Sequence, residues 1–373
     1  MLSVIAASIN AFLITFFVIP SIISVAEIKH LYDTPGQRKS HHSKIPTLGG
    51  IGIFAGFLIS VCLYANFAIT PKLQFIMAAF CLVFILGAKD DIVELTAYKK
   101  FIGQVAAAFI IAYFGDIRIT SLYGVFNISH LNYFVSIALT MFVIILIVNS
   151  FNLIDGINCL GAFSGVIIAS AFGGWFYLND YNDFAILASA IVGSLFAFIK
   201  YNFTPAKIFM GDSGSLTVGI LSSILAIEFI EKSEIIHLQN IGGHFWITAA
   251  PGMAVAILII PLFDTLRAFS LRILNGKSPF VADRNHIHHK LIDIGLSHVQ
   301  ASVLLSIVNI GFIVFGYYLQ FLGNLWMMVA LLAVAIMLSI ILFSIKSLPN
   351  NQSIDENQDS KDNIRPITGI KLG

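Results

Sequence analysis

The chain has 373 residues, of which 58% are hydrophobic and 11% are charged, whereas an ordinary soluble domain carries about 25% charged residues. This composition excludes a soluble globular protein and predicts an all-α protein that crosses a membrane many times. A net charge of +1 gives no large positive field, so we expect no nucleic-acid partner.

Eleven apolar runs follow one another along the chain, and each predicts a transmembrane helix in the lipid bilayer. They form a single polytopic domain over residues 1–346, and the polar, aperiodic residues 347–373 are expected to be a disordered tail. The runs cover residues 2–26, 48–67, 73–88, 101–114, 131–148, 159–178, 184–199, 215–230, 247–263, 299–319 and 325–345.

The basic residues set the expected orientation of these spans. Most lysines and arginines fall in one alternate set of loops and in the tail, whereas only Lys72, Arg118 and Lys232 fall in the other set. By the positive-inside rule, the N-terminus is expected outside and the C-terminus in the cytoplasm. The glycines of "GGIGIFAG" at residues 49–56 lie inside a span and favour close helix packing over a dinucleotide-binding loop.

The first polar cluster follows the third run, where "LGAKDDIVELT" puts Asp90 beside Asp91. Adjacent helical residues point about 100° apart, so Asp90 is expected to share a helix face with Glu94 instead. Paired carboxylates suit Mg²⁺, which is bound through one or two carboxylates, water and substrate phosphates. The alternative is a solvated helix end that nearby lysines neutralise.

A second cluster ends the fifth run, in "IVNSFNLIDGIN". Asn149, Asn152 and Asp155 recur every three residues, which places them on one slowly turning stripe of the helix. Polar groups on one stripe at the membrane edge indicate a lined cavity. The alternative is an ordinary polar helix end that Gly156 terminates.

The third cluster opens the eighth span, in "PAKIFMGDSGSLTVG". Asp212 lies at a helix N-terminus that is expected to face the cytoplasm, where free backbone N–H groups and the helix dipole can bind phosphate. The alternative is a plain Asp or Ser cap. The ninth span contains Pro261, which is expected to kink it and could open a groove for a lipid.

The fourth cluster, "DRNHIHHKL", has His286, His288 and His289 just after Arg284. Three histidines in four residues suggest zinc, but neither a nearby cysteine nor an HExxH pattern supports that site. Anion binding is the favoured interpretation, with a solvated basic loop as the alternative. Together, the acids and cations of one membrane face fit phosphoryl transfer between a nucleotide-linked and a lipid-linked phosphate.

Five motifs carry a resemblance to a known family. "DTPGQRKSHHSKIPTLGG", "KDDIVELTAYKKFIGQ", "VNSFNLIDGIN", "IFMGDSGSLTVG" and "DRNHIHHKL" occur in the order seen in the polyprenyl-phosphate sugar-1-phosphate transferases. The chain resembles their WecA/TagO branch, the N-acetylhexosaminyl relatives of MraY, over most of its length. Glu94 departs from some relatives, and its role stays open.

The resemblance implies that undecaprenyl phosphate attacks the β-phosphorus of a UDP-N-acetylhexosamine, most often UDP-GlcNAc, and releases UMP. It implies Mg²⁺ or Mn²⁺ as cofactor, an active site at the cytoplasmic face and a place in the bacterial cytoplasmic membrane. Asp90 and Asp91 are expected as the catalytic pair, with Asp91 and Asp212 as metal ligands. The remaining implied site residues are Asn149, Asn152 and Asp155 for the nucleotide, Arg284, His286, His288 and His289 for the sugar diphosphate, and Lys39 and Lys44 for phosphate.

Several alternatives stay open at this point. Another UDP-amino sugar, of the FucNAc or QuiNAc type, would need only a different pocket. A membrane transporter would suit many spans with polar groups, but its site would sit near the bilayer midplane between repeats, and none is visible. A UbiA-type prenyltransferase would need a second aspartate-rich motif. The residues do not identify the downstream glycan. They also do not decide whether the mechanism is a direct displacement or proceeds through a covalent intermediate, or whether the enzyme is a homodimer.

Overall fold

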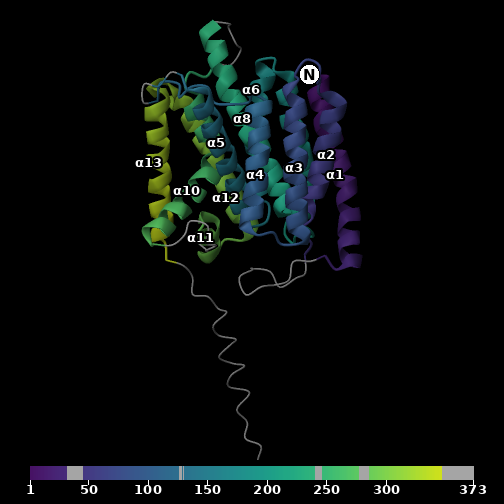
Figure 1. Cartoon of the computed structure of the whole chain (residues 1–373). Helices are drawn as coiled ribbons and strands as arrows, with labels where there is room; N and C mark the ends of the chain where they lie inside the picture. Colours follow the sequence, from purple (N-terminus) through teal and green to yellow (C-terminus); the bar gives the residue numbers. More distant parts are fainter. Residues whose placement is uncertain (32–44, 126–127, 129, 240–245, 277–284, 347–373) are drawn as a thin grey trace, which may run out of the picture.

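The computed structural model describes residues 1–31, 45–125, 128, 130–239, 246–276 and 285–346, and in these ranges all regular structure is helical (Figure 1). The α-helices are α1 (Leu2–Lys29), α2 (Gly49–Tyr64), α3 (Lys72–Ile92), α4 (Ala97–Phe109), α5 (Tyr133–Ile154), α6 (Leu160–Leu178), α7 (Asn182–Asn202), α8 (Gly211–Gln239), α9 (Ala250–Ile257), α10 (Ile259–Leu274), α11 (Ile287–Asp293), α12 (His298–Leu319) and α13 (Gly323–Ser344). The π-helical turn η1 (Ile110–Phe114) continues α4, and the 3₁₀ turn η3 (Gln320–Leu322) joins α12 to α13.

The predicted all-α, multi-pass membrane architecture is confirmed in its coarse form. Six helical stretches in the described part are long and apolar enough to cross a membrane, or seven if the bent pair α9 and α10 counts as one span. One of the six, His298–Ser344, contains both α12 and α13. Other helices, such as α2 with 16 residues and α4 with 13, are shorter than the ~20 residues that a bilayer requires. Eleven spans and their orientation therefore stay predictions.

Helix α8 is the centre of the bundle. Its apolar window is buried along its whole length, and α2, α3, α5 and α6 pack around it. Small residues allow this close packing in a bilayer, where helices gain nothing from leaving water. A Cβ atom on Gly50 of α2 would lie 2.1 Å from the backbone nitrogen of Gly214 in α8. The predicted packing role of the glycine-rich α2 is confirmed.

The predicted kink in the ninth span is a sharp break between α9 and α10, which meet at 79°. Pro261 has no N–H, so the carbonyl of Ile257 lacks its usual helical donor. The side-chain amide of Asn309 on α12 donates to that carbonyl instead, at 3.1 Å. The break lets α10 lead toward the end of the bundle where α11 lies (Figure 1).

An ion-pair network joins α3 to α8 at the opposite end of the bundle. The ammonium group of Lys72, at the start of α3, lies 3.0 Å from the carboxylate of Glu228 in the second half of α8. Lys232 approaches the same carboxylate at 3.4 Å. Since Glu228 is only 3% exposed, its charge depends on these partners for compensation.

We expect Lys72→Met to destabilise the protein by about 1–3 kcal/mol, because a buried carboxylate loses its shorter charge-assisted hydrogen bond. The melting temperature of the detergent-solubilised protein measures the effect. Lys89→Met, on the exposed surface of the same helix, is the matched control and should change stability by no more than about 0.5 kcal/mol. Equal shifts for the two variants would contradict the proposed role of this pair.

Candidate active site

The carboxylate of Asp91, in the last turn of α3, caps the N-terminus of α8. One of its oxygens accepts a hydrogen bond from the backbone N–H of Asp212 at 2.6 Å. The other accepts from the backbone N–H of Ser213 at 3.0 Å and from the Ser213 hydroxyl at 2.5 Å. A negative charge at this position is also stabilised by the helix dipole.

This arrangement corrects the prediction that the first N–H groups of α8 are free for a phosphate. Those of Asp212 and Ser213 already donate to Asp91, because a carboxylate from another helix satisfies the unpaired donors that every helix N-terminus carries. The plain alternative, a cap by the helix's own Asp or Ser, does not account for these donors either. What reaches the site from α8 is the side chain of Asp212.

Two glycines allow Asp91 to reach α8. Gly211 has a φ of +70°, and a Cβ atom there would lie 2.6 Å from one Asp91 oxygen. A Cβ atom on Gly87, one turn before Asp91, would lie 2.5 Å from the Ser213 backbone. Because side chains at these positions would push α3 and α8 apart, both glycines are needed for the contact.

Lys100 of α4 bridges two of the predicted site aspartates. Its ammonium group lies 2.5 Å from Asp90 and 2.7 Å from Asp212. The second oxygen of Asp90 accepts the backbone N–H of Leu95 at 2.6 Å, which holds the turn between α3 and α4. The expected shared helix face of Asp90 and Glu94 is wrong, because α3 ends at Ile92 and Glu94 is exposed beyond it.

The polar stripe of α5 reaches the same junction. The side-chain amide of Asn152 donates to Asp212 at 2.9 Å, whereas Asn149 donates to Gln104 of α4 at 2.9 Å. Asp155 follows the last residue of α5. Burial raises the pKa of its carboxyl well above the usual value, and the negative charges of Asp212 and Asp91 add to the effect.

The histidines line the other side of this region. His286 and His288 are buried and His289 is partly buried. Neither ring nitrogen of His288 makes a hydrogen bond to the described residues, although Nδ1 lies 3.6 Å from the carboxylate of Asp264. Its Nε2 would lie 2.6 Å from a Cβ atom on Gly156, so the glycine leaves room for the ring. A buried ring nitrogen without a hydrogen bond, such as this Nε2, indicates that a ligand completes the site.

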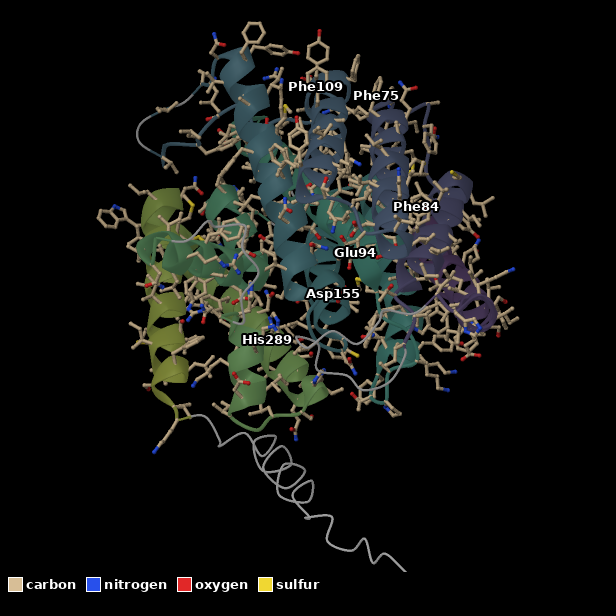
Figure 2. All side chains as sticks on the ribbon, turned by 60° about the horizontal axis from the view of Figure 1, so that its bottom comes forward. Phe75, Phe84, Glu94, Phe109, Asp155 and His289 are labelled. Atoms are coloured by element: carbon tan, nitrogen blue, oxygen red, sulfur yellow. The ribbon has the colours of Figure 1, made fainter. Side chains whose placement is uncertain are left out.

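A cavity of about 960 Å³ lies between Lys100, the polar stripe of α5 and the histidines. Figure 2 shows Asp155 and His289 toward one end of the bundle, away from Phe75 and Phe109. The polar residues of the cavity wall are Lys100, Gln104, Asn149, Asn152, Asp155, Arg272, His286, His288 and His289. Its apolar residues include Leu95, Phe101, Ala138, Met141, Phe142, Ile145, Leu146 and Phe269. The cavity is therefore amphiphilic.

Two side-chain sets in the described part have the composition of a cation site. Asp90, Asp212 and the amide of Asn152 supply oxygen donors, which suit a hard ion such as Mg²⁺, and Lys100 supplies the positive charge in this structure. Asp264, His286 and His288 form the other set, whose ligand atoms lie within 4.8 Å of one another.

Three residues of this site were not predicted from the sequence: Lys100, Arg272 and Asp264. Asp264 directly follows the ninth predicted span, residues 247–263, and an ionisable residue placed against an apolar run is itself a signal of a functional site. The predicted residues Lys39, Lys44 and Arg284 lie outside the described residues.

Comparison with known proteins identifies the family. Residues 73–230 match the family model described as glycosyl transferase family 4. A probable undecaprenyl-phosphate N-acetylglucosaminyl 1-phosphate transferase of Bacillus subtilis (strain 168) is 29% identical over 359 residues, which cover 94% of each chain. The decaprenyl-phosphate N-acetylglucosaminephosphotransferase of Mycobacterium leprae is 31% identical, over 83% of this chain and 81% of the relative.

A third relative extends this agreement to another bacterium. The undecaprenyl-phosphate alpha-N-acetylglucosaminyl 1-phosphate transferase of Escherichia coli (strain K12) is 30% identical over 345 residues, which cover 88% of each chain. The matches span the segments that carry Asp91, Asp212 and the histidines. The chain therefore belongs to the polyprenyl-phosphate N-acetylhexosamine-1-phosphate transferases of glycosyl transferase family 4.

Proposed function

We propose that this enzyme transfers N-acetylglucosamine 1-phosphate from UDP-GlcNAc to undecaprenyl phosphate and releases UMP. The observation that carries the proposal is the cavity lined both by apolar side chains and by Lys100, whose ammonium group also contacts Asp90 and Asp212. An oxygen of the lipid phosphate would form a bond to the β-phosphorus of the donor. The bond from that phosphorus to the bridging oxygen would break, and UMP would leave with this oxygen.

The apolar wall of the cavity supports a lipid acceptor. The α5 residues from Ala138 to Leu146 contribute an apolar stripe at helical spacing, which extends about 12 Å at 1.5 Å per residue. Phe142 on this stripe is 62% exposed, so the groove opens on the surface where bilayer lipid is expected. A polyprenyl chain in this groove would place its phosphate near Lys100.

The polar end supports a reaction between two phosphates. Two such anions repel each other, so the site must supply positive charge and hold them in line. Lys100 supplies one such charge. We propose that Asp90, Asp212 and Asn152 hold Mg²⁺, with the Asn152 amide turned so that its oxygen faces the ion. When bound, this ion would neutralise charge on the donor diphosphate.

The contacts suggest different roles for the two adjacent aspartates. Both oxygens of Asp91 are engaged by the first turn of α8, so we assign it the positioning of Asp212 and not a place among the metal ligands. Asp90 shares Lys100 with Asp212 and is the better placed to align the acceptor phosphate. That phosphate needs little help from a base at neutral pH, since the second pKa of a phosphate monoester is about 6.

The histidine wall and the polar stripe of α5 are proposed to bind the donor. His288 and His289 would donate hydrogen bonds to the sugar diphosphate. Asn149 is held by Gln104, and Asp155 lies next in line along the cavity; both would contact the nucleotide. A donor of the FucNAc or QuiNAc type would use the same phosphate contacts and differ only where the sugar lies.

The relatives and the distribution of basic residues favour the bacterial cytoplasmic membrane as the location, with the site on its cytoplasmic face. The products would be UMP and the lipid-diphosphate sugar from which a surface glycan starts. Both substrates would then reach the cavity from one side of the membrane, UDP-GlcNAc from the cytoplasm and the acceptor from the bilayer.

We expect the purified protein in lipid nanodiscs to release UMP when UDP-GlcNAc, undecaprenyl phosphate and Mg²⁺ are all present. Omission of the lipid, or chelation of the metal with EDTA, should reduce the rate to background. Chromatography of UMP and of the lipid product measures the reaction, and a panel of UDP-sugars tests donor choice. Absence of UMP with every UDP-amino sugar tested would refute the proposal.

We expect Asp212→Asn and Asp91→Asn each to reduce kcat at least about 100-fold, since each removes a charge that organises the phosphates or α8. Initial UMP release rates at saturating substrates measure this loss. Glu94→Gln, an exposed change close by in sequence, is the matched control and should retain wild-type activity. Wild-type rates for both aspartate variants would contradict the assignment.

The apolar groove leads to a separate prediction about the length of the acceptor's polyprenyl chain. Ala138→Trp should raise the KM for undecaprenyl phosphate about tenfold, because a bulky ring would fill the apolar end of the cavity far from the phosphates. The KM for a short acceptor such as farnesyl phosphate should change less. Val135→Trp, on the same helix but outside the cavity wall, controls for the added ring. Equal effects on both acceptors would argue against this lipid path.

A further inference from the structure

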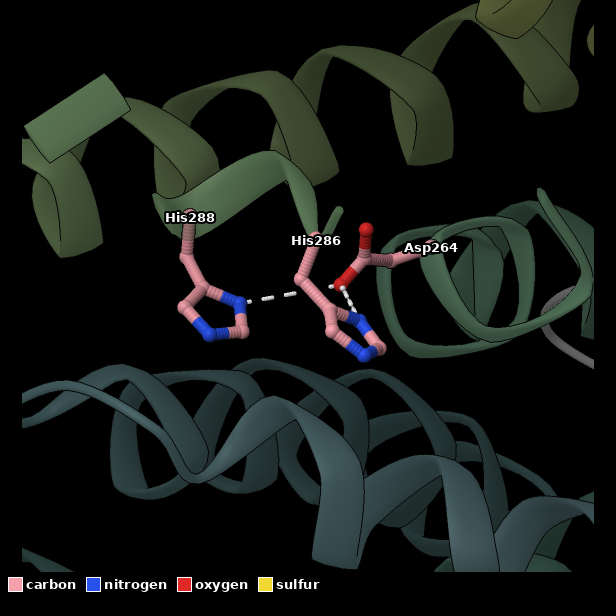
Figure 3. Close-up of side chains that lie close together, drawn as sticks. All are labelled: Asp264, His286 and His288. Carbon is pink, nitrogen blue, oxygen red and sulfur yellow. Dashed lines mark hydrogen bonds and ion pairs between the residues drawn. The ribbon is translucent and has the colours of Figure 1, made fainter. Parts of the chain in front are cut away.

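Asp264 of α10 holds the segment that carries the histidines. One of its carboxylate oxygens lies 3.0 Å from Nδ1 of His286 and 3.6 Å from Nδ1 of His288 (Figure 3). The other oxygen accepts the backbone N–H of Ile287 at 2.7 Å. Asp264 is 3% exposed and His286 4% exposed. A single carboxylate therefore ties two rings and the first residue of α11 to α10.

The contact fixes the protonation pattern of His286. Its Nδ1 faces a carboxylate, which can only accept, so Nδ1 carries the hydrogen. Its Nε2 lies 3.3 Å from a guanidinium nitrogen of Arg272, which can only donate. The two contacts are therefore those of the tautomer with its hydrogen on Nδ1, whose Nε2 accepts from Arg272. This chain of contacts runs from Asp264 through His286 to Arg272, which lines the cavity.

The same residues could also be interpreted as a metal site, because their ligand atoms lie close together. Three features disfavour that interpretation. The distance of 3.0 Å is that of an ordinary hydrogen bond. The other oxygen of Asp264 is already engaged by a backbone N–H. A guanidinium group against the far side of the His286 ring would repel a divalent cation.

We propose that Asp264 is a positioning residue for donor binding: it holds His286 in one tautomer, so that His286 orients the Arg272 guanidinium toward the cavity. Asp264 touches no substrate in this scheme. The proposal rests on the proposed function, in which this wall receives the anionic sugar nucleotide. In this proposal Asp264, on the second helix of the bent pair α9 and α10, controls the affinity for the donor and does not contribute to binding of the acceptor.

The kinetic test is Asp264→Asn in the full-length protein in nanodiscs. The KM for UDP-GlcNAc should rise about 10- to 100-fold, the size expected when a charge-assisted hydrogen bond is lost. The KM for undecaprenyl phosphate should stay within about twofold of wild type. Asp264→Glu, which keeps the carboxylate, should recover part of the donor affinity. Equal increases in both KM values, or no recovery with glutamate, would overturn the proposal.

A double mutant tests whether Asp264 acts through His286. His286→Gln alone should weaken donor affinity, and adding Asp264→Asn to it should have little further effect. Additive losses would contradict the proposed chain of contacts. Melting temperatures identify variants that fail to fold. If Asp264→Asn does not fold, the comparison of Asp264→Glu with wild type, by KM for each substrate, decides the question.

Two measurements do not depend on turnover, so they separate this proposal from the proposed function. Solid-state NMR of ¹⁵N-histidine protein in lipid, with the His286 signal assigned from its loss in His286→Gln, should show a neutral ring with hydrogen on Nδ1. A ring with hydrogen on Nε2 would overturn the proposal. Metal analysis of the purified protein should find no stoichiometric ion that Asp264→Asn removes, because such an ion would make this a metal site instead.

Discussion

The contact on which the rest of the site depends is the carboxylate of Asp91 against the N-terminus of α8. A helix that begins inside a packed bundle has backbone donors that need partners, and here another helix supplies them with a charged group. The bonds fix the end of α3 relative to the start of α8, and thereby set where Asp90 and Asp212 lie. Lys100 then joins those two side chains to α4. The neighbouring helices α3 and α4 are thus held within hydrogen-bonding distance of α8, although Lys100 and Asp212 lie 112 positions apart in the sequence. The proposed reaction requires such an arrangement, because it gathers two phosphates at one place.

The opposite end of the same helix pair is held by charge as well. Lys72 and Glu228 connect the start of α3 to the second half of α8, so the two antiparallel helices are tied at two well-separated points. In a bilayer the hydrophobic effect does not drive helices together, so close packing and paired polar groups must do so. Between the two ties, the glycines of α2, α3 and α8 bring the backbones into contact. Asp90, Asp91 and Asp212 are therefore held by tightly packed helices.

The site has two parts, and each belongs to a different part of the fold. Asp90, Asp91 and Asp212 stand on α3 and α8, which belong to the tightly packed core, and Lys100 connects Asp90 and Asp212 to the cavity. The histidines stand at the start of α11, which Asp264 attaches to α10 beyond the break in the ninth span. Pro261 and Asn309 together permit that break. The apolar stripe of α5 lines the same cavity as the histidines, so the proposed nucleotide and lipid substrates would each meet a surface of matching polarity.

The sequence by itself determined the all-helical membrane class, because long uncharged runs have no other stable arrangement in lipid, and it determined the family through five ordered motifs. It also located Asp90, Asp91, Asp212 and Asn152, since polar residues stand out against apolar spans. Only the tertiary structure decided what these residues contact: Asp91 takes the backbone donors expected to bind phosphate, Glu94 falls outside the helix, and Lys100 and Asp264 enter the site. The physical reason is that hydrogen-bond partners here lie up to 122 positions apart along the chain, and spacing within one helix carries no information about which helix lies beside it.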